Sequence, residues 1–63
     1  PPMEQLTKRE TELLASLAGG ATNVQLAEQL GVSVNTVKFH LRNLYEKLDV
    51  RNRAQAVAMY LSE

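Results

Sequence analysis

Residues 22–48 read TNVQLAEQLGVSVNTVKFHLRNLYEKL, and this stretch decides the fold. A short apolar repeat at Leu26, Ala27 and Leu30 is followed by Gly31 and then by a longer apolar repeat. Glycine often ends a helix because it adopts the left-handed cap conformation without a steric penalty. A short helix, a turn of about four residues that contains glycine and a longer helix form a helix-turn-helix. Many helical proteins contain such a pair by chance, so the longer helix has to carry the functional argument.

The longer helix is predicted from about Val34 to Leu48, with Ser33 as its N-cap. Its apolar residues recur at steps of three and four, which is the spacing of one inward stripe on a helix. They are Val34, Val37, Leu41, Leu44 and Leu48. At about 100° per residue, the single phenylalanine of the chain, Phe39, lies nearly opposite the centre of this stripe. The sequence therefore predicts that the only phenylalanine ring faces away from the core.

The outward face of this helix combines cations, an amide and an apolar ring. Its members in the N-terminal half are Asn35, Lys38, Phe39 and Arg42. In a DNA major groove, Lys and Arg pair with guanine O6 and N7, Asn pairs with an adenine edge, and an apolar group contacts a thymine methyl. A recognition helix inserts its N-terminal half into the groove. We therefore interpret the four residues as a base-reading face. The alternative is a surface helix with one stray aromatic, because isolated exposed apolar residues are common.

Three further helices are predicted around the third. The first opens at Thr7 with Glu10 as its reciprocal capping partner, and the second opens in the same way at Thr22 with Gln25. The fourth follows Asn52, which is a favourable N-cap. No segment combines sustained period-two alternation with a strand-like composition. The sequence therefore predicts an all-α domain, a four-helix bundle that contains a helix-turn-helix.

Length and composition exclude several classes of protein. A chain of 63 residues makes one small domain without room for a deep cofactor site. Without cysteine there is no disulfide framework and no thiolate metal site, and a single histidine cannot form a multi-histidine site. No apolar run approaches the roughly 20 residues of a membrane span. No phosphate loop and no nucleophile–base pair is present, so we expect that the chain is not an enzyme. We also expect no metal or cofactor. The lack of cysteine is compatible with a reducing cytosol, and we expect a cytoplasmic protein.

The charges divide unevenly along the chain although they cancel overall. Residues 31–53 hold five basic and two acidic residues, whereas residues 1–30 hold two basic and four acidic residues. Such a split can attract an anion such as DNA to one face of a neutral protein. A solvated basic face explains the same distribution equally well, so charge alone does not decide between the two interpretations.

The predicted fourth helix has two apolar stripes on nearly opposite faces. The first comprises Ala54, Val57, Ala58 and Leu61, and the second comprises Ala56, Met59 and Tyr60. An element that is apolar on two faces is usually covered on both. We assign the first stripe to the core and the second to a homodimer contact. There are three alternatives for the second stripe. It could be an exposed apolar surface without a partner, a contact with another domain, or the binding surface of a protein-interaction module that does not bind DNA.

Five short motifs match one protein family in order. They are LTKRE at residues 6–10, N-x-x-L-A-x-x-L at residues 23–30, S-x-x-T-V-K-x-H at residues 33–40, KL at residues 47–48 and RAQA at residues 53–56. On these motifs the chain resembles the DNA-binding domain of bacterial transcription regulators of the LuxR/NarL type, also called the FixJ or GerE type. The resemblance covers nearly the whole chain.

The resemblance implies sequence-specific binding of double-stranded DNA in transcription regulation, as a dimer on paired half-sites. The third helix would enter the major groove, where the positions of Lys38, Phe39 and Arg42 supply base contacts in the family, and the fourth helix would dimerise. The family positions of Asn23, Thr36 and His40 lie near backbone phosphates. Ser33 and Lys47, on the same flank of the third helix as His40, complete the predicted phosphate set.

The resemblance also implies a domain arrangement and partners. We expect residues 1–5 to be the end of a linker and residues 6–63 to be the DNA-binding domain, in the C-terminal part of a longer regulator. An upstream regulatory domain and RNA polymerase are then expected partners. The runner-up interpretation is a promoter-reading domain similar to those of sigma factors, which use a similar helix-turn-helix.

Several side chains depart from the family pattern or stay undecided. Val24 stands where the family often has a lysine or a polar residue, and Asp49 replaces the usual glycine, so Asp49 is expected in the left-handed cap conformation. Glu10 and Arg53 could pair and tie the first helix to the fourth, or be two separate surface charges. Tyr45 is either an edge of the core or a donor to phosphate.

Overall fold

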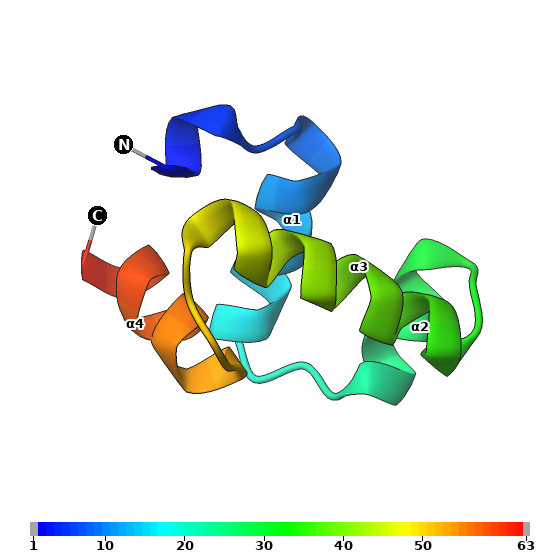
Figure 1. Cartoon of the computed structure of the whole chain (residues 1–63). Helices are drawn as coiled ribbons and strands as arrows, with labels where there is room; N and C mark the ends of the chain where they lie inside the picture. Colours follow the sequence, from blue (N-terminus) through cyan, green and yellow to red (C-terminus); the bar gives the residue numbers. More distant parts are fainter. Residues whose placement is uncertain (1, 63) are drawn as a thin grey trace.

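The computed structural model describes residues 2–62 of the chain. It contains η1 (Pro2–Gln5), α1 (Lys8–Ala18), α2 (Asn23–Leu30), α3 (Val34–Leu48) and α4 (Arg53–Ser62). η1 is a short 3₁₀ helix, and no strand occurs within the described part of the chain. In Figure 1, α3 crosses in front of α1, with α2 near one end and α4 near the other. The prediction of an all-α domain with four α-helices is confirmed.

The helices begin where capping side chains satisfy their free N–H groups. Thr7 Oγ1 accepts from the Glu10 N–H at 3.1 Å, while Glu10 Oε1 accepts from the Thr7 N–H at 2.8 Å. Thr22 and Gln25 repeat this reciprocal pair at the start of α2. At the start of α4, Asn52 Oδ1 accepts from the backbone N–H three residues on, at 2.9 Å. The local sequence therefore fixes where these helices start.

Two left-handed residues end the helices of the helix-turn-helix. Gly31 closes α2 at φ 69°, and Asp49 closes α3 at φ 56° and ψ 43°. Asp49 is the one residue other than glycine with positive φ within the described chain, and its predicted left-handed conformation is confirmed. A side chain with a Cβ pays a steric cost there, so the short α3–α4 connection is held in a conformation that glycine would adopt more easily.

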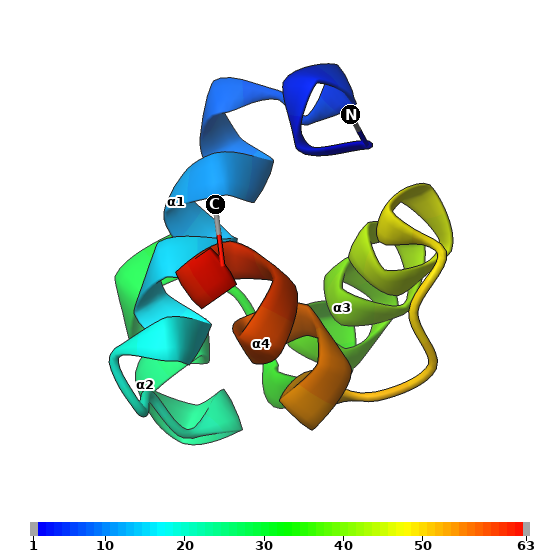
Figure 2. The ribbon, with the colours of Figure 1, turned by 90° about the vertical axis from the view of Figure 1, so that its left-hand side faces the viewer.

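The core lies between the four α-helices, and its buried residues are all apolar among the described residues. Its buried members are Leu13, Leu14, Leu17, Leu26, Ala27, Val37, Leu41, Leu44, Leu48 and Ala56. In the orthogonal view of Figure 2, α4 lies between α1 and α3, and it packs against both. Because α2 packs on α3 and α4 packs mainly on α1, the outer side of α3 is left open. No helix within residues 2–62 is both long and apolar enough to cross a membrane.

The exposed face of α4 differs from the predicted one. The sequence assigns Ala54, Val57, Ala58 and Leu61 to the core, but Ala54 and Ala58 are exposed and Leu61 is 69% exposed. Val57 alone of this stripe is half-buried against the core. The outward apolar stripe of α4 is therefore Ala54, Ala58 and Leu61.

The inward face of α4 contains the residues that the sequence assigns to a dimer contact. Ala56 is fully buried within the monomer, so its assignment to a dimer surface is wrong. Met59 and Tyr60 are half-buried and pack against the core. These two side chains are already in contact with their own chain, so they leave little area for a partner.

The rotation of α4 has a physical cause at its first residue. The guanidinium of Arg53 reaches inward and donates to the Ala21 carbonyl at 2.6 Å and to Asn23 Oδ1. Because residues three, four and seven positions apart share one side of a helix, this anchor also turns Ala56 and Tyr60 inward. Neither alternative left open for Glu10 and Arg53 is found, because Arg53 binds the start of α2 and Glu10 accepts from Lys47.

The N-terminal residues that the sequence assigns to a linker end include a short helical turn. Residues 2–5 form the 3₁₀ turn η1, which packs against α3. Pro1, the first residue of the predicted linker, lies outside the described part of the chain.

Candidate DNA-binding surface

The outward side of α3 is open to solvent, as its sequence pattern predicts. Phe39 is 58% exposed, and Asn35, Lys38 and Arg42 are exposed on the same side of the helix. The opposite side of α3 carries its buried residues, which are Val37, Leu41, Leu44 and Leu48. The helical register of α3 is thus confirmed, and an apolar ring, two cations and an amide lie together on one accessible strip.

The Phe39 ring is supported by its neighbour His40. The two ring centroids lie 6.1 Å apart with an interplanar angle of 63°, an edge-to-face arrangement that aromatic rings favour. His40 is exposed and lies between the outward strip and the α1 side of α3. The contact leaves Phe39 58% exposed, so the ring stays available to a ligand.

The residues predicted to contact phosphate are held by different partners. Ser33 caps α3 by accepting from the Thr36 N–H at 3.1 Å, and the two hydroxyls lie 3.0 Å apart. Asn23 accepts from Arg53 through Oδ1, so its amide nitrogen keeps its N–H donors for another partner. Ser33 and Thr36 lie at the N-terminal end of α3, and Asn23 lies at the start of α2.

Lys47, also predicted to contact phosphate, already has a partner. Its Nζ donates to Glu10 Oε1 at 2.8 Å, with 42% of the Lys47 side chain and 20% of the Glu10 side chain exposed. This hydrogen bond from Lys47, together with the one from the Thr7 backbone, holds the pKa of Glu10 below its ordinary value. The pair links α1 to α3, and it makes Lys47 a less available cation than the sequence suggests.

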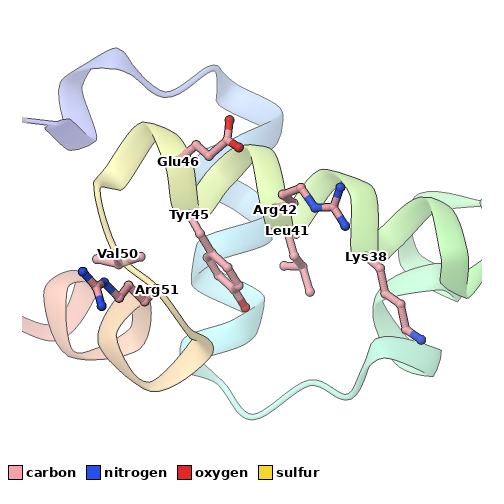
Figure 3. Close-up of a pocket in the computed structure, with 7 residues that line it drawn as sticks. All are labelled: Lys38, Leu41, Arg42, Tyr45, Glu46, Val50 and Arg51. Atoms are coloured by element: carbon pink, nitrogen blue, oxygen red, sulfur yellow. The ribbon is translucent and has the colours of Figure 1, made fainter.

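A groove that the sequence does not reveal runs along the other flank of α3. It has a volume of about 400 Å³ and lies between α3 and the α3–α4 connection. Its lining residues are Lys38, Leu41, Arg42, Tyr45, Glu46, Val50 and Arg51. Figure 3 shows Lys38 and Tyr45 pointing to the same side of α3, with Val50 and Arg51 on the connection beside them. The undecided Tyr45 is half-buried, with its ring in the wall of this groove.

The arrangement of motifs and helices matches one family along almost the entire chain. The family of bacterial regulatory proteins called the luxR family matches residues 4–60. The chain belongs to the luxR family. The predicted resemblance is therefore confirmed, and the chain is a helix-turn-helix DNA-binding domain of the transcriptional-regulator type. Proteins of this family are regulators that bind DNA, so the prediction that the chain is not an enzyme agrees with its luxR membership.

Individual luxR-type relatives are similar over most of this chain. The probable transcriptional regulatory protein SgaR of Hyphomicrobium methylovorum is 62% identical, over 97% of this chain and 29% of its own length. The transcriptional regulatory protein LiaR of Bacillus subtilis is 49% identical, over 87% of this chain and 26% of its own length. The nitrate/nitrite response regulator protein NarP of Escherichia coli is 45% identical, over 98% of this chain and 29% of its own length. The chain thus spans less than a third of the length of these curated relatives.

Proposed function

We propose that this luxR-type domain regulates transcription by binding specific double-stranded DNA sequences, with α3 in the major groove. The observation that carries the proposal is the outward strip of α3. It exposes an apolar ring, two cations and an amide on the N-terminal half of the helix that follows the turn. This is the half that a recognition helix presents to base edges.

Each residue of the strip has a role that follows from its chemistry. Lys38 and Arg42 donate to guanine O6 and N7, and Asn35 pairs with an adenine edge. Phe39 contacts a thymine methyl, because its side chain offers shape and apolar surface only. Asn23, Ser33, Thr36 and His40 lie along the phosphates at the start of α2 and on the flank of α3, with Lys47 as a weaker contributor.

A selection of bound duplexes from a random-sequence library, followed by substitution of Arg42, tests the proposal. The wild-type domain should enrich one short half-site. Arg42→Ala should lose about 1–3 kcal/mol on that half-site and relax the preference at one or two base pairs. It should bind scrambled duplexes nearly as well as the wild type does. Enrichment of no sequence by the wild-type domain would contradict base reading by α3.

The proposal extends to dimeric binding on paired half-sites, through α4. The exposure of Ala54, Ala58 and Leu61 supports a contact through this stripe in place of the predicted residues. Three small or medium side chains bury far less than the roughly 1,200 Å² of a stable interface. We therefore expect a monomer in solution that pairs on DNA.

Two further partners belong to the same proposal. One is a regulatory domain elsewhere in the full-length protein, which the limited coverage of the relatives supports. The other is RNA polymerase, which a regulator of transcription has to influence, and both would be met in the cytoplasm.

A further inference from the structure

We propose that Arg53 is a positioning residue for DNA binding. Its guanidinium holds the Asn23 side chain so that the amide nitrogen, and not the amide oxygen, faces the phosphate backbone. The inference rests on the proposed function, in which Asn23 lies along the phosphates at the start of α2. It gives Arg53, the first residue of α4, a part in DNA binding without any contact of its own with DNA.

The guanidinium of Arg53 holds the residues on both sides of the α2 N-cap. It donates through Nη1 to the Ala21 carbonyl at 2.6 Å and through Nη2 to Asn23 Oδ1. Thr22, which lies between these two acceptors in the chain, is the N-cap itself, and its Oγ1 accepts from the Gln25 N–H. The donors of a guanidinium lie in one rigid plane, so two bonds fix both the place and the angle of the group. The bond to Ala21 already ties α4 to the connection between α1 and α2, and the bond to Asn23 adds control of one side chain.

The chemistry of the two groups decides how the Asn23 amide is turned. A guanidinium donates hydrogen bonds and cannot accept one, whereas an amide has an accepting oxygen and a donating nitrogen. The amide must therefore present Oδ1 to Arg53, because the reversed amide would set donors against donors. An asparagine without such a partner can turn either end toward a ligand, and only its nitrogen end can donate to a phosphate oxygen.

The amide nitrogen of Asn23 is left free and accessible. It has no hydrogen-bond partner among residues 2–62, and no unpaired polar side-chain atom of these residues is buried from solvent. Asn23 is half-buried and bound through its oxygen, and an amide that is already fixed loses little rotamer freedom when it binds a ligand. Both acceptors of Arg53 are neutral oxygens, so the charge of the guanidinium polarises the amide and makes its N–H groups better donors to an anion.

A double-mutant cycle of Asn23→Ala and Arg53→Lys in the 63-residue chain tests the inference. Lysine keeps the positive charge but lacks the guanidinium fork. Kd for the selected duplex is measured at a temperature at which circular dichroism shows the variants to be folded. Each single change should raise Kd by about tenfold or more, the effect of one hydrogen bond to a charged group. Because Arg53 acts through Asn23, the double variant should bind no more weakly than Asn23→Ala alone.

A role of Arg53 in the fold alone would give a different result. Arg53→Lys would then raise Kd by the same factor in the Asn23→Ala background as in the wild type, and the two effects would multiply. Multiplied effects would overturn the inference, and so would an unchanged Kd for Asn23→Ala.

Asn23→Asp supplies a second measurement, which leaves Arg53 in place. The new carboxylate still accepts from the guanidinium and puts a negative charge at a helix N-terminus, so the melting temperature should equal or exceed that of the wild type. Kd should rise by about tenfold or more for the selected and the scrambled duplex alike, because the N–H donors are lost and phosphate contacts carry no sequence information. A lower melting temperature would show that Arg53 does not bind this position, and it would overturn the inference.

Gln25→Glu is the matched control for Asn23→Asp. It makes the same change from amide to carboxylate in the first turn of α2, where the side chain keeps its capping bond from the Thr22 N–H, and it removes no donor held toward DNA. It should therefore raise Kd by a smaller factor, and an equal rise in the two variants would overturn the inference. Failure of the inference alone leaves a wild-type domain that still enriches a half-site through Arg42, whereas failure of the proposed function removes that enrichment.

Discussion

Under the proposed function, base reading and folding depend on different residues of α3: the exposed Phe39 on one side and the buried residues on the other. Phe39 is 58% exposed, so Phe39→Ala removes no core contact. Its effect on the free energy of unfolding should stay within about 0.5 kcal/mol, and alanine is the better helix former. Urea denaturation should give a midpoint close to that of the wild type. A loss of several kcal/mol would show that the ring is buried and that the register of α3 is wrong.

The same variant should still bind DNA less well on its cognate half-site. Replacing the contacted thymine with uracil should reproduce part of this loss for the wild type, because only the methyl group is removed. On the Phe39→Ala variant the same replacement should have little further effect. Equal losses from uracil in both proteins would exclude a contact between Phe39 and the methyl group.

Asp49 is the residue whose backbone conformation suits its side chain least. Asp49→Gly should raise the free energy of unfolding by a few tenths of a kcal/mol. Two effects stabilise the variant: glycine adopts the left-handed conformation at φ 56° without a steric cost, and a negative charge is removed from a helix C-terminus. The greater entropy of glycine in the unfolded chain opposes them and keeps the gain small. Asp49→Asn separates these effects, since it removes the charge alone. A melting temperature for Asp49→Gly at or below that of the wild type would refute this account.

At the scale of elements, the link between α1 and α3 makes stability depend on pH. The Lys47 hydrogen bond depresses the pKa of Glu10 in the folded chain, so the stabilisation is present above the ordinary value of 4.5. It is lost as the pH falls from that value through the lower folded pKa. In thermal melts, Glu10→Gln should have a lower melting temperature than the wild type at neutral pH. Below about pH 4.5 its melting temperature should fall less steeply than that of the wild type. Identical pH profiles would show that the pair contributes nothing.

The exposed stripe of α4 predicts where a partner chain attaches. Leu61→Glu places a charge on the 69% exposed end of that stripe, so it should abolish cooperative binding to a duplex with two half-sites. Binding to a single half-site should stay nearly unchanged, because no DNA-facing residue is touched. Gel-shift titrations on the two duplexes measure both effects. An equal loss on both would assign the defect to folding or to direct DNA contact.

The contrast between α3 and α4 shows how far the sequence predicts which face of a helix is turned toward the core. In α3 a single apolar stripe from Val37 to Leu48 leaves one face to bury, so its outward strip follows from periodicity. In α4 two apolar stripes are equally good, and periodicity cannot rank them. The choice is made by Arg53, which binds Ala21 and Asn23 some 30 positions earlier in the chain. Helical periodicity cannot show the groove beside Tyr45 either, because the α3–α4 connection forms one of its sides.

At the scale of the whole molecule, a small apolar core leaves little stability to spare. At about 0.05–0.15 kcal/mol per residue, a chain of 63 residues has roughly 3–9 kcal/mol in total. Leu44 is fully buried, so Leu44→Ala should remove about 2–5 kcal/mol. Circular dichroism should show a helical wild-type chain with one cooperative transition and a largely unfolded variant near body temperature. A Leu44→Ala variant as stable as Phe39→Ala would mean that the core is not where the structure places it.

The open outer side of α3 has an evolutionary consequence. The side chains at Asn35, Lys38, Phe39 and Arg42 add little to folding, so each can be exchanged without endangering the scaffold beneath it. Under the proposed function, a lineage that keeps the leucines of α3 can therefore change its preferred operator one side chain at a time, through intermediates that all still fold. Duplicated copies of such a regulator would diverge first on this strip, and grafting a sister protein's four residues onto this chain should carry over that protein's preference.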